Sequence, residues 1–316
     1  KAIYLLKNNL KFIFMNKFNL AIIGSSRIAE IHYKFLNKYN FCKIYFVGRK
    51  KEKIISFLKK HKIKDTKTLT KKNFNKKNFN IISLCNNSNF HQDYLDIIKY
   101  NPNLLIIEKP IISIQVFKKK YKSYLKKIYK KFSSVIVIYP MVFLARSICN
   151  FINIKDKINS LELHYYTSGP QTYEENFLDL SPHALTFFYE ICKLKKIKLN
   201  KINKIEKDVK EKRWKGTIYF ENIKLLINFK KIPKNHKSKF YIKINNLNIE
   251  RLIRKKNNTF INYLKFNKKI IEIINPMESV FENAIHALKK KKFLIENKKL
   301  TKWLMNLTCK IYEQNN

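Results

Sequence analysis

Apolar runs of strand length alternate with segments of helical periodicity through residues 18–140, and this alternation constrains the fold more than any other feature. Between the runs, apolar residues recur three or four positions apart, as Ile28, Ile31 and Phe35 do, which is typical of one helix face. Strands that alternate with helices in this way predict a parallel, doubly wound sheet, an α/β arrangement. The expected strands are residues 18–23, 43–47, 79–85, 104–107 and 135–139.

The pattern changes near Pro140, where we place a boundary between two domains, residues 15–140 and residues 141–316. In the second domain, strand patterns follow one another between residues 208 and 275, and the turns between them are too short for helical crossovers. We therefore expect an antiparallel sheet and an α+β fold there. The expected strands are residues 160–167, 216–220, 223–229, 240–244, 260–266 and 270–274, and the expected helices are residues 143–154, 182–194, 277–290 and 300–313.

Length and composition are those of a globular protein with two domains. Of the 316 residues, 45% are hydrophobic and 14% are aromatic, which argues against disorder. No apolar run approaches the roughly 18 residues that a membrane-spanning helix needs, so we expect a soluble, cytoplasmic protein without a membrane partner. Met15 directly precedes the first domain, and we interpret residues 1–14 as an upstream or non-native extension and not as a signal peptide.

The cysteines and histidines do not form a recognisable metal-binding pattern. The five cysteines are scattered without a CxxC pair, and three of them fall in apolar stretches, which suits buried, reduced thiols. No histidine pair with metal-ligand spacing is supported by acidic residues. We therefore predict that the protein has no metal site.

The formal net charge of +45 invites a nucleic-acid interpretation, because basic surfaces attract phosphate backbones. The lysines, however, occur along nearly the whole chain and do not gather in one block. Lys, Asn, Ile and Phe are all abundant while only 4 glycines occur, and these four abundant residues share A/T-rich codons. We interpret the charge mainly as compositional bias, which makes nucleic acid an unfavoured partner and stays compatible with a phosphorylated substrate.

The first expected strand ends at Gly24, and the segment from Ser25 to Ile28 opens the helix that follows it. A dinucleotide needs such a tight turn and free N–H groups at a helix N-terminus to hold its pyrophosphate. Ser26 stands where a second glycine is usual; its hydroxyl could bond a phosphate, but its Cβ restricts the approach of a ligand. Ser25 or Ser26 is the expected N-cap, and a segment of this kind is by itself more often an ordinary strand-to-helix turn.

The second strand ends at Gly48 and is followed by Arg49, where NAD enzymes commonly carry an acid that accepts from the ribose 2′-hydroxyl. No acid is present to repel a 2′-phosphate, and Arg49 could pair with that phosphate or stack on the adenine. This arrangement favours NADP over NAD. The alternative is that Arg49 is one more basic residue in a basic protein.

The fourth strand ends at the tripeptide Glu108-Lys109-Pro110. In an open parallel sheet the ligand lies beyond the carboxyl ends of the strands. A lysine at this position could reach the reacting carbon of a substrate, where its ammonium group could polarise a carbonyl or relay a proton. Lys109 is therefore a candidate catalytic residue.

Three segments together resemble the Gfo/Idh/MocA oxidoreductases, with matching order and spacing across about residues 18–140. They are the Gly24 turn with Arg27, Ile28, Ala29 and His32, the stretch 81–88 followed by His91, and Glu108-Lys109-Pro110. The resemblance implies a Rossmann domain for residues 15–140 and a large open, mostly antiparallel sheet for the second domain. The cofactor-binding residues that it implies are Gly24, Ser25, Ser26, Arg27, Ile28, Arg49, Asn86, His91, Glu108 and Lys109.

The second domain carries Asp179 and His183 four residues apart, a spacing that places both side chains on one face of a helical turn. The resemblance implies that His183 and Lys109 exchange the hydroxyl proton while hydride passes to the nicotinamide, and that Asp179 binds or orients the substrate. A histidine near its ordinary pKa suits a proton relay. The alternative is a histidine at a helix start that makes a merely structural hydrogen bond.

These observations predict an NAD(P)-dependent dehydrogenase or reductase that acts on a hydroxyl or carbonyl of a sugar, inositol-like or nucleotide-sugar substrate. The resemblance also implies a homo-oligomer. Ser26, and the absence of the family's Asn/Arg pattern after residues 135–139, motivate a first alternative: an inactive, nucleotide-binding regulatory protein. A basic protein that binds polyanions is the second alternative.

Overall fold

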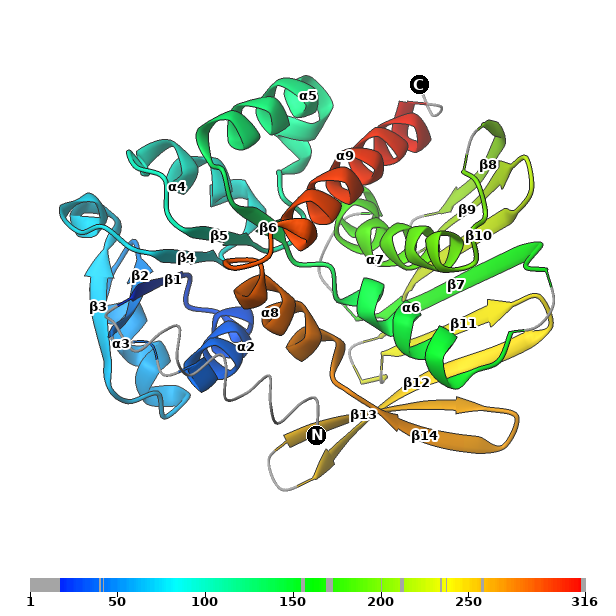
Figure 1. Ribbon diagram of the computed structural model, residues 1–316, viewed down its shortest axis with the longest axis horizontal. Helices are drawn as coiled ribbons and strands as arrows, with labels where there is room; N and C mark the ends of the chain where they lie inside the picture. The colour runs from blue at the N-terminus through cyan, green and yellow to red at the C-terminus, as the bar shows by residue number, and fades with distance from the viewer. Residues whose placement is uncertain are drawn as a thin grey trace. The chain divides into compact units, whose positions relative to one another are not determined.

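The chain divides into two units, each with its own sheet (Figure 1). The first unit contains the chain up to Ile138 together with Phe281–Lys299, and the second contains Tyr139–Val280 together with the chain from Leu300 onward. The extension expected over residues 1–14 lies outside the described residues. The computed structural model describes residues 18–39, 41, 43–154, 157–168, 173–199, 201–210, 213–233, 235–236, 238–256 and 259–313.

The first unit is built on a six-stranded sheet in the order β3-β2-β1-β4-β5-β6, and every neighbouring pair is parallel. The strands are β1 (Asn19–Ile23), β2 (Lys43–Gly48), β3 (Thr66–Thr70), β4 (Ile81–Leu84), β5 (Leu104–Ile107) and β6 (Val135–Val137). All four residues of β4 and of β5 are buried, as expected for central strands covered on both faces. The predicted doubly wound parallel sheet is confirmed.

The helical segments between these strands follow the predicted alternation. The stretch 65–78, where no strand is expected, contains β3 and the short helix η2, and the helix before β5 ends at Ile97 because the backbone of Ile98 is extended. The segments are α2 (Arg27–Leu36), η1 (Asn37–Tyr39), α3 (Lys51–Lys60), η2 (Lys71–Lys76), η3 (Ser88–Phe90), α4 (His91–Ile97) and α5 (Ile114–Lys131).

The returning segment Phe281–Lys299 completes the first unit. The Phe281 ring packs on α2, where it contacts the His32 ring edge-on at 4.7 Å and stacks on Phe35 at 5.5 Å between centroids. The Asn297 side chain accepts a hydrogen bond from the Val137 amide and donates one to the Val137 carbonyl, both at 2.9 Å. A side chain from near the end of the chain thus occupies the free hydrogen-bonding groups of the edge strand β6.

The second unit is built on an eight-stranded sheet in the order β14-β13-β12-β11-β7-β10-β9-β8. Every neighbouring pair is antiparallel except β7 with β10, so the expected mostly antiparallel sheet is confirmed. The strands are β7 (Ser160–Thr167), β8 (Ile202–Lys210), β9 (Arg213–Phe220), β10 (Lys224–Lys231), β11 (Lys239–Ile244), β12 (Leu247–Lys256), β13 (Thr259–Phe266) and β14 (Lys269–Ile273).

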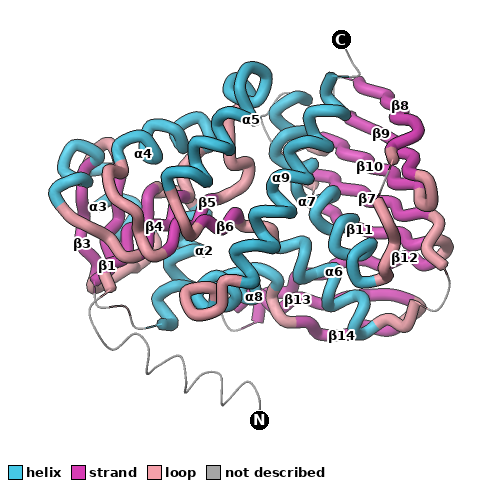
Figure 2. Tube along the Cα trace, turned by 45° about the horizontal axis from the view of Figure 1, so that its top comes forward, coloured by secondary structure: helices cyan, strands magenta, loops and turns pink. Residues whose placement is uncertain are grey.

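Helices α6 and α7 pack against each other, and α7 contacts strands β7, β9 and β10. They lie on one face of the eight-stranded sheet (Figure 2). Pro140 begins α6 at a position where its missing N–H has no partner to lose, and a part-buried ion pair at 2.7 Å joins Arg146 of α6 to Glu190 of α7. The remaining helices are α6 (Pro140–Phe151), α7 (Tyr173–Leu194), α8 (Pro276–His286) and α9 (Lys292–Glu313).

Helix α7 begins earlier than predicted, since it starts at Tyr173 and includes Pro182 in its interior. A proline inside a helix is a weak signal for a boundary, because neighbouring groups can take up the carbonyl that it leaves without a donor. Here the carbonyl without its usual helical donor is that of Leu178, four residues earlier, and the Thr186 hydroxyl donates to the Pro182 carbonyl one turn further on. In the part of the chain that the structure describes, no helix is long and apolar enough to cross a membrane.

Candidate active site

Gly24 ends β1 in a backbone conformation that only glycine adopts without strain. Its φ is +137°, and a Cβ built there would lie 3.1 Å from the Asn86 amide nitrogen and 3.2 Å from the Cys85 carbonyl carbon and oxygen. The Gly24 amide donates to the Val47 carbonyl at 3.0 Å. The turn therefore joins the carboxyl ends of β1, β2 and β4 in close backbone contact.

Ser26, one of the two residues expected at this position, is the N-cap of α2. Its side chain makes no capping hydrogen bond. Its φ of −119° and ψ of 174° are extended backbone that any residue adopts, so a serine in the place of the usual glycine introduces no backbone strain. Residues Ser25 to Ile28 are exposed at this helix start. The first N–H groups of a helix have no partner within it, and they are suited to an anion.

Arg49 follows the carboxyl end of β2 and lies over the Phe90 ring, with 3.5 Å between the guanidinium carbon and the ring centroid. The arginine is exposed, while Phe90 of η3 is half-buried. This cation–π contact holds the planar guanidinium group at the edge of the sheet. Nothing in the sequence marks Phe90 as a partner of Arg49, because an aromatic residue after a polar turn is equally a core residue.

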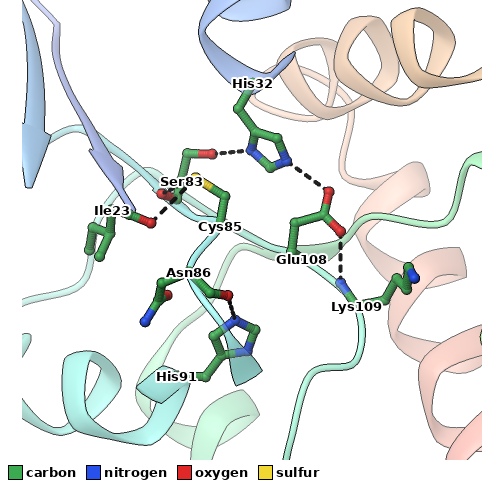
Figure 3. Close-up of polar contacts among 8 residues, drawn as sticks. All are labelled: Ile23, His32, Ser83, Cys85, Asn86, His91, Glu108 and Lys109. Carbon is green, nitrogen blue, oxygen red and sulfur yellow. Dashed lines mark hydrogen bonds and ion pairs between the residues drawn. The ribbon is translucent and has the colours of Figure 1, made fainter. Parts of the chain in front are cut away.

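A buried chain of polar contacts connects α2, β4 and the Lys109 backbone (Figure 3). The fully buried His32 lies with Nδ1 2.6 Å from the Ser83 hydroxyl and Nε2 2.8 Å from one carboxylate oxygen of Glu108. The other carboxylate oxygen accepts from the Lys109 amide at 3.1 Å. Glu108, predicted as a cofactor-binding residue, is thus placed where its carboxylate fixes the main chain of Lys109 relative to α2.

His91 lies with its two ring nitrogens against two main-chain carbonyls, Nε2 at 2.9 Å from Asn86 and Nδ1 at 3.2 Å from Ile111. Burial lowers the pKa of His91, against the opposing effect of these two carbonyls and of the Glu108 carboxylate. The neutral ring has one N–H and can donate to only one of the carbonyls. In this arrangement His91 connects the turn after β4 to the segment after Pro110, and it does so from the interior.

The Asn86 side chain is the polar group at this edge that is best placed to bind a ligand. Both its amide nitrogen and its carbonyl oxygen are buried, and neither has a hydrogen-bond partner among the protein atoms. The main-chain nitrogen of Asn86 lies against Gly24, so the side-chain carboxamide of Asn86 is next to the glycine turn. A buried carboxamide without partners is costly unless another molecule satisfies it.

The predicted cofactor-binding residues of the first unit therefore gather at one edge of its sheet. Residues 24–28 follow β1, Arg49 follows β2, Asn86 follows β4 and residues 108–109 follow β5. Because all these strands are parallel, their carboxyl ends meet at the same edge, where α/β sheets of this kind bind their ligands.

In the second unit, Asp179 and His183 both lie within α7, one helical turn apart, and both are half-buried. The His183 ring stacks on Tyr165 of β7 with 5.9 Å between centroids and 14° between planes. His183 is ten residues after the first residue of α7, so it is not a residue of the helix start. The pair thus lies on the part of α7 that faces the sheet.

His164, the residue before Tyr165 in β7, lies on the opposite face of the sheet. Successive residues of a strand point to opposite faces, so His164 points away from the side of Tyr165 and α7. Its ring stacks on Tyr241 at 4.3 Å, and its Nε2 lies 3.1 Å from the Glu162 carboxylate. It is separated from His183 by the thickness of the sheet.

The thiols and acidic groups form no further site in the described residues. Cys85, Cys149, Cys192 and Cys309 are free, and burial raises the pKa of the Cys85 thiol well above its ordinary value. The fifth cysteine, Cys42, lies outside the described residues. Over the described ranges, no group of three His, Cys, Asp or Glu side chains is arranged to hold a metal ion.

No family model matches the sequence, and no curated protein is similar to it. Solved structures, in contrast, match over nearly the full length. A Gfo/Idh/MocA family oxidoreductase from Vibrio cholerae gives a TM-score of 0.61 at 11% identity, covering 95% of this chain and 99% of that one. The chain has the Gfo/Idh/MocA fold. An oxidoreductase from Agrobacterium radiobacter, in complex with NAD+, L-tartaric acid and magnesium, gives 0.60 at 10% identity, covering 95% and 98%.

A third similar structure is the UDP-N-acetylglucosamine 3-dehydrogenase from Acidithiobacillus ferrooxidans, with a TM-score of 0.62 at 8% identity, covering 94% of this chain and 97% of that one. The architecture implied by the resemblance is thereby confirmed for both units. At such identities the comparison is one of fold, and the roles of single residues depend on the geometry of this chain. Ser83 and Phe90 are residues of this site that the sequence interpretation did not single out. Ser83 could have been noticed, because it is a polar residue inside an apolar strand.

Proposed function

We propose that the protein is an NAD(P)-dependent oxidoreductase that transfers a hydride between the nicotinamide and a hydroxyl or carbonyl group of a sugar, inositol-like or nucleotide-sugar substrate. The observation that carries the proposal is the buried, unpartnered Asn86 carboxamide beside the Gly24 turn, at the carboxyl edge of a parallel sheet. The NAD+ of the Agrobacterium radiobacter structure and the UDP-sugar activity of the Acidithiobacillus ferrooxidans enzyme support the same cofactor class and substrate class.

Each predicted residue has a task in this proposal. The amides at the start of α2, from Ser26 to Ile28, hold the pyrophosphate, and the Ser26 hydroxyl is available as an additional donor because it does not cap the helix. The nicotinamide supplies or accepts the hydride. Lys109 and His183 exchange the hydroxyl proton of the substrate, and Asp179 orients it.

NADP is the proposed cofactor, because Arg49 stands after β2 without an acid beside it and can pair with a 2′-phosphate. We expect fluorescence titration of the purified protein to show tighter binding of NADPH than of NADH. Arg49→Ala should weaken NADPH binding about tenfold, since a charge-assisted hydrogen bond contributes about 1.5–3 kcal/mol, and should change NADH binding little. Lys53→Ala, which removes an exposed charge from the neighbouring α3, is the control.

Two results would separate the parts of this proposal. Tighter binding of NADH, unaffected by Arg49→Ala, would overturn the choice of NADP and leave the oxidoreductase in place. Binding of neither nucleotide would overturn the cofactor site itself.

A homo-oligomer is also part of the proposal, through the sheet face that α6 and α7 leave open (Figure 2). This face carries half-exposed Leu226, Tyr241 and Tyr263 among charged side chains, and aromatic residues are enriched at protein interfaces. We expect sedimentation velocity to show a dimer or larger assembly that Leu226→Lys weakens. A monomer at micromolar concentration would contradict this part.

A further inference from the structure

Arg251 of β12 belongs to the same face of the eight-stranded sheet as Tyr165, the residue on which His183 stacks. Paired residues of neighbouring strands share a face: Tyr165 pairs with Phe240, and Tyr241 pairs with Glu250. Because successive residues alternate between faces, Arg251 lies on the side of Phe240 and opposite to Glu250. β7, β11 and β12 are consecutive strands of this sheet (Figure 1).

The Arg251 guanidinium group has a neutral partner where a buried cation ordinarily has a carboxylate. Its Nε and one terminal nitrogen donate to the same Asn262 side-chain oxygen, at 3.1 and 2.6 Å. Asn262 is 2% exposed, and within the described part of the chain no carboxylate lies within ion-pair distance of Arg251. Burial lowers the pKa of Arg251, and the nearby Tyr165 hydroxyl acts in the opposite direction.

A largely buried cation without a counter-ion is unfavourable unless an anion completes its surroundings. An arginine has five N–H donors, and the two hydrogen bonds to Asn262 leave the other N–H groups of the guanidinium available. A planar fork of this kind binds carboxylates and phosphates through two parallel hydrogen bonds. The chemistry of the position is therefore that of an anion-binding group.

Tyr165 is the residue through which the position of Arg251 can be compared with that of His183. Its ring stacks on His183 at 5.9 Å and contacts Phe240 at 5.5 Å between centroids, while its hydroxyl is the titratable group that acts on Arg251. The two aromatic rings therefore lie on the same sheet face as Arg251, and Tyr165 is in contact with His183, all within the second unit.

We propose that Arg251 binds an anionic group, a carboxylate or a phosphate, of the substrate whose reacting carbon lies at His183. The proposal rests on the proposed function for the identity of His183, and it narrows the substrate class to acidic or phosphorylated sugars and sugar-like polyols. A neutral sugar would leave the guanidinium group without its counter-ion.

The test is calorimetric titration of the full-length protein without cofactor, using D-gluconate, D-glucose 6-phosphate and neutral D-glucose. We expect at least one anionic probe to bind at least tenfold more tightly than glucose, and the preferred probe distinguishes a carboxylate site from a phosphate site. Arg251→Gln should remove the difference, and Arg251→Lys should restore part of it. Arg254→Gln is the matched control, since Arg254 lies on the opposite face of the same strand, exposed and over the Tyr263 ring.

The proposal is overturned if neither anionic probe binds more tightly than glucose, or if Arg254→Gln weakens binding as much as Arg251→Gln does. The second result would assign the binding to the overall positive charge. If Arg251→Gln does not fold, a folded Arg251→Met that binds the anionic probes as tightly as the unaltered protein overturns it equally. Because no nucleotide is present, loss of the proposed cofactor function would leave these results unchanged.

Discussion

Replacing Lys109 with methionine is expected to lower kcat by about 10²–10⁴-fold, the range of a positioned proton-transfer group, while the Kd for NADPH stays within about twofold. The Glu108 carboxylate bonds the Lys109 amide and His32, and neither contact involves the lysine side chain. Methionine keeps an unbranched side chain and removes only the ammonium group. The loss should therefore be one of turnover and not of folding.

The measurement is single-turnover hydride transfer followed at the nicotinamide absorbance, with nucleotide binding measured in parallel. His183→Gln should reduce turnover to a similar degree, and the double variant should lose little more, because residues that act as one relay are not additive. Lys99→Met, which removes an exposed lysine of the same unit, serves as the control. Unchanged turnover in both Lys109→Met and His183→Gln would remove these residues from the mechanism; retained NADPH binding without turnover in the unaltered protein would favour the regulatory alternative.

Gly24→Ala is expected to lower the free energy of unfolding by on the order of 3 kcal/mol and to abolish measurable NADPH binding. At φ +137° an L side chain is strained, and the new Cβ would press on the Cys85–Asn86 backbone, which cannot move without displacing β4. The displacement would fall on the same turn that holds the Asn86 carboxamide. Urea unfolding curves and nucleotide titration measure the two effects.

Gly48→Ala is the matched control for this prediction. Gly48 also ends a strand of the first sheet, but a Cβ there would meet only Ile54 side-chain atoms, at 3.0 and 3.2 Å, and its φ is not in the left-handed region. We expect a clearly smaller loss of stability. Equal effects of the two substitutions would show that the Gly24 conformation is not the cause.

The parallel sheet was predictable because buried strands read as continuous apolar runs, and the strands of Gly24 and Lys109 were located for that reason. The two strands missed in the second unit, β8 and β12, lack that signal. In β12 the stretch Glu250–Arg254 carries charged residues on both faces, which hides the alternation on which strand recognition depends. The residue that obscured the strand, Arg251, is the one now proposed to bind substrate.

The candidate site was predictable only where a residue type is tied to a strand end. Arg49 was singled out because it follows a strand, and Asn86 because of the family resemblance, but the geometry of both depends on contacts between distant segments. The bond between His32 and Glu108 spans 76 residues of sequence, and neither residue type requires the other. Such a pairing becomes visible only when β4, β5 and α2 are brought together by the fold.

The return of residues 281–299 to the first unit determines when that unit can finish folding during synthesis. Its edge strand β6 is complete at Val137, but the Asn297 side chain that occupies the strand's free groups is made 160 residues later. The Phe281 ring that packs on His32 is likewise absent until synthesis has passed residue 280. A nascent chain that ends at residue 140 therefore exposes a parallel sheet with an unprotected edge, and this first unit is completed only after the intervening residues 139–280 of the second unit have been made.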